Sequence, residues 1–418
     1  MDNPNLIDKL TARLSPPGRE ALVRAVAAAV EARLSLYLVG GSVRDLLLGR
    51  PTIDVDLVVE GDAPPLARRI AEVLAARCLV HPAFGTATVK LTGFAFDIAT
   101  ARAESYARPG ALPTVRPAGL RDDLARRDFT INAMALSLTG PARGELVDPF
   151  GGREDLRRGL VRLLHDRSFV DDATRILRAL RYEARLRFRL EESTLDRLRR
   201  DVGYLATISG ARLRRELLRT LAEPEPEEAL LRAMGLGVLA AVHPALSFDA
   251  GLAAAFAEAR RQVRAEQLPL VYLALLASRW SEGEAEAVAA RLSLTKAQWE
   301  AAAAMPRLRS LAPALAAAVL RPSRATDLLS PYPQAALWAF ALTADAAAGD
   351  RARQYLRSWR YVKPSLDGDA LLAMGASEGP ALGELLRRLR AAKLDGRVST
   401  REEEEAFVRA ALAEAPNE

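Results

Sequence analysis

The segment LYLVGGSVRDLLLGRPTIDVDLVV, residues 36–59, decides the fold of the first part of the chain. It opens with four apolar or aromatic residues that predict a short strand, which ends at Gly40-Gly41. Residues 42–48 then predict the start of a helix, and residues 53–59 predict a second strand. The segment therefore predicts a strand, a glycine turn, a helix and another strand, as in an α/β domain.

The glycine turn is suited to an anion. Backbone N–H groups at such a turn can approach phosphate closely, and a helix N-terminus favours negative charge. Ser42 could donate a hydrogen bond there, and Arg44 could add positive charge. Most glycine pairs are ordinary turns, so the pair becomes informative only through the acidic strand that follows it.

Two carboxylates lie in that strand. Residues two apart on a strand face the same side, so Asp54 and Asp56 project together. Adjacent carboxylates repel unless a cation lies between them, and Mg²⁺ prefers such hard oxygen ligands. Asp97 could be a third ligand, because it shares a strand face with the small residues Ala95 and Ala99. The alternatives are an exposed edge strand for the pair and a solvent-facing position for Asp97.

The rest of the first third also alternates strand and helix. A helix is predicted over residues 66–76, with Ile70, Val73 and Leu74 on its apolar side, and a hairpin over residues 86–100. After about residue 155 the strand signals stop, and the sequence is rich in Leu, Ala and Arg at helical spacing. The predicted fold class is therefore an α/β head on a long helical body.

Composition excludes several classes of protein. The 418 residues are 50% hydrophobic and 27% charged, which excludes a disordered chain. The one cysteine, Cys78, cannot form an internal disulfide, and three histidines argue against chemistry that needs several. The N-terminus lacks the apolar segment of a signal peptide, and the longest apolar run has ten residues. We therefore expect a soluble, cytoplasmic protein without a membrane partner.

Positive charge is concentrated behind the head. The whole chain carries +6, whereas residues 151–220 contain 18 Arg and 11 acidic residues and carry +7. A polyanion could lie along the helices of this segment. The alternative is a set of solvated helix faces with ion pairs one turn apart.

A second polar motif, LARRDFTINAMA, covers residues 124–135. Its two arginines, Arg126 and Arg127, can bind phosphate oxygens through their guanidinium forks, and Asp128 could cap a helix. Asn132 is informative because the chain has four asparagines and the other three lie near its ends. Its amide could reach a ribose hydroxyl, and a buried structural asparagine is the alternative.

Together with DPFGGREDL at residues 148–156, these motifs resemble those of class II tRNA nucleotidyltransferases. This family comprises the CCA-adding enzymes and bacterial poly(A) polymerases, within the DNA polymerase β superfamily. The resemblance extends from about residue 36 to 220. It implies a nucleotidyltransferase head of the DNA polymerase β type, followed by an all-α neck, body and tail. We place these four parts at residues 1–145, 146–222, 223–330 and 331–418.

The resemblance also implies substrates and site residues. It implies two Mg²⁺ ions at the acidic strand, CTP and ATP as substrates, and the acceptor stem and elbow of tRNA as partner. Asp54 and Asp56 would be the catalytic pair and, with Asp97, the metal ligands. The nucleotide-binding residues would be Gly40, Gly41, Ser42, Arg44, Arg127, Asp128, Asn132, Asp172, Arg175 and Arg178.

The segment DDATRILRALR, residues 171–181, resembles the family's base-reading motif Glu-Asp-x-x-Arg, with Asp171 as the first acid. Asp172 and Arg175 are three apart, which puts them on one face of a helix. A carboxylate accepts and a guanidinium donates hydrogen bonds, so this pair can read the amino group and ring nitrogen of cytosine or adenine. Uracil and guanine present the reverse pattern and should be rejected. The alternative is a salt bridge between the two residues within the helix.

Residues 104–116 predict a loop, because they contain two prolines and a glycine. It is similar in position to the loop that helps the family's pocket change from CTP to ATP, and its presence favours competence for adenine. The loop residues that we single out are Glu104, Tyr106 and Arg108.

Two further regions could serve either the structure of the protein or the binding of RNA. Arg212 lies in a segment that resembles the last family motif, and its spacing from Glu216 predicts an ion pair that braces the neck. Basic and aromatic residues alternate over residues 351–363, which is typical of RNA binding or of an amphipathic helix. The residues assigned as further RNA contacts are Arg212, Arg357, Trp359 and Lys363.

The sequence therefore predicts a tRNA nucleotidyltransferase that adds C and A to the 3′ end of tRNA. Within the same chemistry, the alternatives are a CC-adding enzyme, an A-adding enzyme and a poly(A) polymerase. From another class comes a non-catalytic RNA-binding protein, which would not need clustered carboxylates facing a polyanion.

Overall fold

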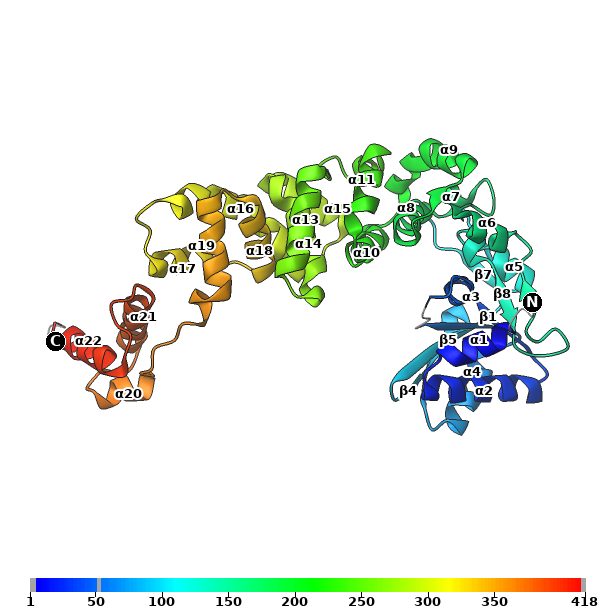
Figure 1. Ribbon diagram of the computed structural model, residues 1–418, viewed down its shortest axis with the longest axis horizontal. Coiled ribbons are helices and arrows are strands. Elements are labelled where there is room, and N and C mark those ends of the chain that lie inside the picture. Colours follow the sequence, from blue (N-terminus) through cyan, green and yellow to red (C-terminus); the bar gives the residue numbers. More distant parts are fainter. Residues whose placement is uncertain (1–4, 51–53, 415–418) are drawn as a thin grey trace. The chain divides into compact units, whose positions relative to one another are not determined.

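The computed structural model describes residues 5–50 and 54–414. The chain divides into two compact units: unit 1 comprises residues 1–216 and 235–241, and unit 2 comprises residues 217–234 and 242–418. All strands among the described residues belong to unit 1, which confirms the predicted order of an α/β head followed by helices (Figure 1). No helix in the described ranges is long and apolar enough to cross a membrane.

A seven-stranded mixed sheet forms the centre of the head, in the order β3-β4-β5-β2-β1-β8-β9. Its strands are β1 (Ser35–Val39), β2 (Val55–Glu60), β3 (Arg77–His81), β4 (Thr86–Leu91), β5 (Phe94–Thr100), β8 (Ala135–Ser137) and β9 (Leu146–Val147). The β4–β5 hairpin confirms the prediction. The predicted second strand is β2, and its expected first residue, Ile53, lies outside the described residues.

Helices α2 (Pro16–Glu31) and α4 (Ala63–Val73) pack on one face of the sheet (Figure 1). Ile70 is fully buried there, as the periodicity of α4 predicts. Val73 is 58% exposed, so its predicted place on the apolar side is wrong. It is the last helical residue, and the chain turns at Ala75, whose φ is +49, before it enters β3 at Arg77.

The opposite face of the sheet carries α5 (Leu120–Ala125), whose leucines share a buried cluster with Val39 and Val58. Asp56 is two residues from Val58 and therefore projects from this same face. The other elements of the head are α1 (Leu6–Arg13), α3 (Gly41–Leu47), η1 (Pro82–Phe84), η2 (Thr130–Asn132) and a separate hairpin of β6 (Arg102–Ser105) and β7 (Thr114–Pro117).

The helices that follow the head in unit 1 are short. They are α6 (Gly152–Arg158), α7 (Ser168–Asp171), α8 (Thr174–Leu186), α9 (Glu192–Asp201), η3 (Val202–Thr207), the first part of α10 (Gly210–Leu221) and most of α12 (Val238–Val242). A parallel pair, β10 (Leu160–Val161) and β11 (Arg189–Leu190), lies among them. The prediction that strands end near residue 155 therefore missed two strands of two residues each, which are too short to give a periodic signal.

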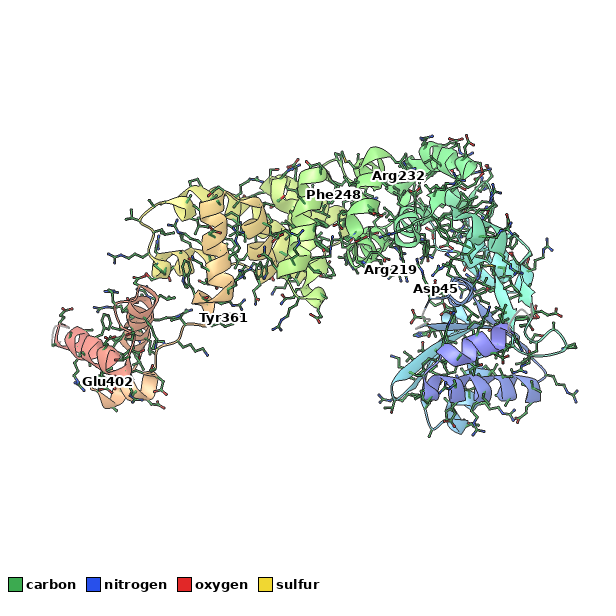
Figure 2. All side chains as sticks on the ribbon, viewed as in Figure 1. Asp45, Arg219, Arg232, Phe248, Tyr361 and Glu402 are labelled. Carbon is green, nitrogen blue, oxygen red and sulfur yellow. The ribbon has the colours of Figure 1, made fainter. Side chains whose placement is uncertain are left out.

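The remaining helices belong mainly to unit 2. They are α11 (Pro226–Gly235), α13 (Ala250–Gln262), η4 (Ala265–Gln267), α14 (Leu268–Leu276), η5 (Ala277–Arg279), α15 (Glu282–Leu292), α16 (Lys296–Ala316), α17 (Pro322–Leu329), α18 (Gln334–Thr343), α19 (Ala346–Arg357), η6 (Trp359–Tyr361), α20 (Gly368–Ala373), α21 (Pro380–Leu394) and α22 (Arg401–Ala413). An aromatic stack lies in the core of this unit. Phe256 lies parallel to Tyr272 at 4.2 Å and against the edge of Phe248, which is labelled in Figure 2.

Candidate active site

The Gly40-Gly41 turn joins β1 to α3 and requires glycine at its first position. Gly40 has φ +71, a conformation that L side chains rarely adopt, and its N–H donates to the Met134 carbonyl at 3.1 Å. A Cβ added to Gly40 would lie 2.6 Å from Nη1 of Arg127. The missing side chain therefore makes room for the Arg127 guanidinium directly at the turn.

Ser42 connects this turn to the acidic strand. Its hydroxyl donates to the Asp54 carbonyl at 2.8 Å and accepts from the Asp56 N–H at 3.3 Å. The hydroxyl that the sequence assigned to phosphate is thus engaged with the backbone on both sides of Val55. Because Ser42 is buried, these bonds fix the backbone from which both carboxylates project.

Asp56 has two neighbouring carboxylates at the start of β2, Asp54 one residue before the strand and Asp97 on β5. Asp56 lies directly opposite Asp97 on the parallel strand β5, and the charges of Asp97 and Asp54 both act on it. Burial raises the pKa of the Asp56 carboxyl; Arg127 opposes this rise, and the two neighbouring carboxylates add to it. Oδ1 of Asp97 accepts from the Thr88 hydroxyl at 2.6 Å. Within residues 5–50 and 54–414, no three acidic, His or Cys side chains are grouped closely enough to hold one ion.

Arg127 is held beside the carboxylates by a buried acid that the sequence motifs did not single out. Its Nη2 donates to Asp123 at 2.9 Å, and Asp123 is fully buried on α5. Burial opposes ionisation of Asp123, but the charges of Arg127 and Arg126 outweigh it and lower its pKa. Nε of Arg127 is buried without a hydrogen-bond partner among the described residues. Such a donor, beside a glycine turn, is placed to meet an anion.

Asn132 and Asp128 belong to a buried chain of polar contacts that joins the head to α8. Nη1 of Arg44 donates to Oδ1 of Asn132 at 2.6 Å, and Nδ2 of Asn132 donates to Oδ1 of Asp128 at 3.0 Å. Nε of Arg178 donates to Oδ2 of Asp128 at 2.8 Å. Arg44 also pairs with Asp45, which is labelled in Figure 2, at 2.9 Å. This series of polar contacts thus fixes the orientation of the Asn132 amide from both sides.

Asp128 is the negative centre of that chain. Burial opposes its ionisation, but the charge of Arg178 and the hydrogen bonds from Asn132 and Arg178 outweigh burial and lower the pKa of Asp128 to about 2. The paired Asp128 raises the pKa of Arg178 in turn. The residue does not cap an α-helix: it precedes the 3₁₀ turn η2 and accepts from the Phe129 N–H at 2.9 Å.

Asp172 does not share a helix with Arg175, so that prediction is wrong. α7 ends at Asp171 and α8 begins at Thr174, and Asp172 between them is extended, with φ −141 and ψ 94. Its Oδ1 accepts from the Thr174 amide at 3.0 Å and from the Thr174 hydroxyl at 2.6 Å. These local bonds offer the backbone an alternative to a continuous helix, which is the physical reason for the break.

Arg175 is nevertheless one turn away from Asp172, because its N–H donates to the Asp172 carbonyl at 3.0 Å. Its side chain is 5% exposed; Nη1 donates to the Ser168 hydroxyl, and Nη2 donates to the Arg126 carbonyl at 2.7 Å. Asp172 forms its ion pair with Arg212 instead. An Asp172–Arg175 salt bridge, the alternative considered above, is therefore not formed in the described part of the chain.

Arg212 does not pair with Glu216, so the predicted brace is wrong. Its Nη2 lies 2.7 Å from Oδ1 of Asp172, and its Nη1 donates to the Gly110 carbonyl at 3.4 Å. Glu216 instead accepts a hydrogen bond from Arg181 at 3.1 Å, and both of these residues belong to unit 1. Helical spacing made the i,i+4 pair plausible, but other charged groups in the neck compete for both residues.

The loop between β6 and β7 lies next to Arg212, the partner of Asp172. The strands themselves extend into the segment predicted as loop, so its irregular part covers residues 106–113. The Tyr106 hydroxyl donates to Glu104 at 3.0 Å, and Glu104 accepts from Arg126 at 3.0 Å. Burial raises the pKa of Tyr106, with smaller effects from Glu104, Arg175 and Asp172. The charges of both base-reading residues therefore act on Tyr106, whereas Arg108 is exposed.

Gly110 fixes where this loop packs. Its φ is +77, and a Cβ added there would lie 2.4 Å from the Thr207 carbonyl of η3. No real Cβ comes this close to a backbone oxygen, so the loop can rest on η3 only with glycine at this position.

The residues assigned to RNA in the last part of the chain lie at the end of α19 and just beyond it. Arg357 is exposed, donates to Gln262 at 2.9 Å, and lies 5.9 Å from the ring centre of Trp338. Trp359 is half-buried in η6, and Lys363 is exposed. Tyr361, labelled in Figure 2, is 65% exposed beneath Arg360. The helical alternative holds for Tyr355, which is buried, but not for Trp359, which lies past the helix end.

Comparisons with known proteins identify the family of the chain. A family described as the poly A polymerase head domain matches residues 36–162, and one described as a probable RNA and SrmB-binding site of polymerase A matches residues 187–249. The A-adding tRNA nucleotidyltransferase of Geobacter sulfurreducens is 35% identical over an alignment of 396 positions that covers 90% of this chain and 45% of that protein. The chain thus spans less than half the length of that relative.

Two further proteins are similar over nearly their whole length. The CC-adding tRNA nucleotidyltransferase of Deinococcus radiodurans is 34% identical over 91% of this chain and 90% of its own. The Thermotoga maritima CCA-adding enzyme complexed with tRNA_CCA is 30% identical, with a TM-score of 0.76 and 98% of both chains covered. The chain therefore belongs to the tRNA nucleotidyltransferase family, whose members carry a poly(A) polymerase head domain.

Proposed function

We propose that the chain adds C and A to the 3′ end of tRNA from CTP and ATP, with release of pyrophosphate. One observation carries the proposal: the base-reading pair follows the glycine turn and the acidic strand by more than a hundred residues, yet the Arg126-Arg127 segment contacts both, with Arg127 at Gly40 and the Arg126 carbonyl accepting from Arg175. A relative that covers nearly the whole chain is named for addition of C, and another is named for addition of A. We expect the enzyme to act in the cytoplasm, where tRNA is processed.

The acidic strand fits two Mg²⁺ ions. Asp54 and Asp56 offer hard oxygen ligands, and the raised pKa of Asp56 reflects burial together with carboxylate repulsion that a cation would relieve. Bound there, Mg²⁺ would supply positive charge to the attacking 3′-hydroxyl and to the departing pyrophosphate. Asp97 stays a candidate third ligand from the adjoining strand. Ser42 holds the backbone of this strand, and Arg127 would bind the phosphates beside the glycine turn.

Asp172 and Arg175 would select the base. Among the described residues, the side-chain contacts of Asp172 end on Oδ1, so Oδ2 can accept from the amino group of cytosine or adenine. Arg175 uses two of its five N–H groups for Ser168 and Arg126, and another can donate to the neighbouring ring nitrogen. Uracil and guanine would place a carbonyl against the carboxylate and an N–H against the guanidinium. The site would reject them because Oδ2 of Asp172 would face another acceptor and the Arg175 guanidinium would face another donor.

The remaining parts would bind tRNA. We propose the four-part division into head, neck, body and tail given above, with the arginine-rich neck at the acceptor stem. Arg357, Trp359 and Lys363 would contact the elbow through backbone charge and stacking. The similar Thermotoga maritima enzyme is complexed with tRNA_CCA, and this supports tRNA as the partner of the present chain.

A partial enzyme is the second candidate. Two relatives that match about nine-tenths of this chain are named A-adding and CC-adding. With either activity alone, the present chain would need a partner enzyme to complete the CCA end. The charges of the base-reading pair act on Tyr106 in the loop over residues 106–113, which favours competence for ATP.

The double substitution Asp54→Asn and Asp56→Asn tests the enzymatic proposal. We expect loss of nucleotide incorporation on a tRNA that lacks CCA, with tRNA affinity and thermal unfolding nearly unchanged. Asp62→Asn is the matched control, because Asp62 is exposed at the other end of β2 and caps nothing through its side chain. Normal incorporation by the double variant would overturn the metal assignment.

A further inference from the structure

We infer that Tyr182 positions the sugar-recognition groups, by holding the two arginines at the ends of the Arg44–Asn132–Asp128–Arg178 chain. The inference rests on the proposed function and goes beyond it, since no motif assigns a role to this tyrosine. Tyr182 would be a positioning residue, because it acts on the nucleotide through Asn132.

Three guanidinium groups surround one aromatic ring. The central carbons of Arg44, Arg178 and Arg181 lie 5.3, 5.6 and 5.3 Å from the ring centre of Tyr182. Phe129 meets the same ring edge-on, at 5.8 Å and 82°. A cation within about 6 Å of a ring face is attracted by its quadrupole, and the attraction grows when water is excluded. Arg44 is only 3% exposed, so its contact with the ring is a desolvated one.

The Tyr182 ring links the two ends of the Arg44–Asn132–Asp128–Arg178 series. Arg44 holds Oδ1 of Asn132, Asn132 holds Asp128, and Asp128 holds Arg178, as described above. Tyr182 contacts the first and the last member of this series, which come from α3 and from α8. The Tyr182 hydroxyl lies 3.4 Å from Nη2 of Arg178, and a hydrogen-bonding interaction with the same hydroxyl helps to raise the pKa of Arg44. The aromatic face contacts three guanidinium groups and the hydroxyl acts on two of them, so Tyr182→Phe separates the ring from the hydroxyl.

This series leaves Asn132 with one amide N–H and one lone pair, each with a fixed direction. A ribose hydroxyl both donates and accepts, so these two positions suit it. Without the ring, Arg44 and Arg178 would keep their carboxylate partners, Asp45 and Asp128, but would lose the aromatic face that fixes the direction in which Arg44 donates to the amide. The expected consequence is weaker binding of the ribose hydroxyl, and thus weaker discrimination against 2′-deoxynucleotides.

Base selection should be unaffected, because the base-reading residues are held by other partners. Asp172 is held by Thr174 and Arg212, and Arg175 is held by Ser168 and Arg126. A loss of sugar discrimination without a loss of base discrimination would therefore distinguish this role from general loosening of the site.

The test compares Tyr182→Phe and Tyr182→Leu by single-turnover kcat/KM for CTP, 2′-deoxy-CTP and UTP. We expect Tyr182→Phe to keep the CTP preference over 2′-deoxy-CTP within about twofold, and Tyr182→Leu to lose about tenfold of it, with UTP still rejected. Tyr204→Leu is the matched control, because Tyr204 is a partly exposed tyrosine of η3 in the same unit. Equal sugar preference in wild type and Tyr182→Leu would overturn the inference.

A second measurement keeps the inference testable if the leucine variant fails to fold. Phenylalanine analogues with one, two or three fluorines at position 182 keep the ring shape and weaken its negative face stepwise. A stepwise fall in sugar preference supports the cation–π role, and a flat series overturns it. If wild type incorporates no nucleotide at all, the proposed function fails and the kinetic test has no substrate, so the two failures are distinguishable.

Discussion

Nη2 of Arg212 lies 2.7 Å from Oδ1 of Asp172, so the acid proposed to read the base is paired with an arginine forty residues further along the chain. The same guanidinium donates from Nη1 to the Gly110 carbonyl at 3.4 Å. Arg212 thus contacts both the base-reading acid and the loop over residues 106–113. The ion pair fixes the rotation of the Asp172 carboxylate and leaves its second oxygen for the base.

Arg212→Ala should weaken base selection more than it weakens binding of tRNA. Without its partner, the Asp172 carboxyl would rotate, and the preference for CTP over UTP should fall roughly tenfold. Single-turnover incorporation of each nucleotide on a tRNA lacking CCA measures this preference. Arg215→Ala is the control, because Arg215 lies on the same helix and forms neither of these contacts. If both variants bind tRNA less tightly and keep the wild-type preference, Arg212 is an RNA contact and not a positioning residue.

Gly110→Ala should displace the loop from η3. The new Cβ would lie 2.4 Å from the Thr207 carbonyl, in addition to the cost of φ +77. Because the loop is proposed to serve adenine addition, incorporation of ATP on a tRNA ending in CC should fall more than incorporation of CTP. Gly93→Ala separates the two causes, since Gly93 has the same φ of +77 and no described atom near its Cβ position. Equal losses in both variants would mean that backbone strain, and not the contact with Thr207, is responsible.

Ser42→Ala should slow the reaction while leaving nucleotide binding nearly intact. The substitution removes the hydroxyl that bridges the Asp54 carbonyl and the Asp56 N–H, so the two carboxylates would lose their fixed spacing. We expect kcat to fall about tenfold, with the KM for CTP changed less than about threefold. A variant in which KM rises and kcat stays unchanged would instead return Ser42 to the triphosphate-binding role expected from the sequence.

Asp128 should make the head sensitive to acid. Its pKa of about 2 in the folded protein lies below the ordinary value near 3.9, so its stabilising contribution is present above about pH 4 and is lost as the pH falls through 2. The contribution is about 2 kcal/mol of unfolding free energy. Chemical unfolding between about pH 2 and 7 measures it. Asp128→Asn should be less stable at neutral pH and should lose this part of the acid dependence; an unchanged dependence would contradict the assignment.

The local features of the head could be predicted from the sequence. Strands with period-two patterns and a helix with a clear apolar side, such as β4, β5 and α4, are confirmed. The common face of Asp54 and Asp56 stays a prediction, because β2 begins at Val55 and Asp54 lies one residue before it; the charge of Asp54 does act on Asp56. The short strands β8 and β9 were missed, because two or three residues give no periodic signal.

The partners within the site could not be predicted, because they depend on tertiary contacts. Arg212 pairs with Asp172 and not with Glu216. Asp123 binds Arg127 and Ser168 binds Arg175, and no spacing in the sequence indicates either contact. One error was avoidable: Asp commonly caps or breaks a helix, and Asp172 precedes Ala-Thr at the point where α8 begins.

The most direct measurement is a single-turnover extension assay with Mg²⁺ on three forms of one tRNA, ending before the CCA, after C and after CC. Each form is offered CTP, ATP, UTP or GTP alone, and CTP with ATP. We expect CTP and ATP together to complete all three ends and stop at CCA, while UTP and GTP are refused. A stop after CC, or activity with ATP on the CC end alone, would identify the corresponding partial enzyme. No incorporation on any end would contradict the central claim and favour a protein that only binds RNA.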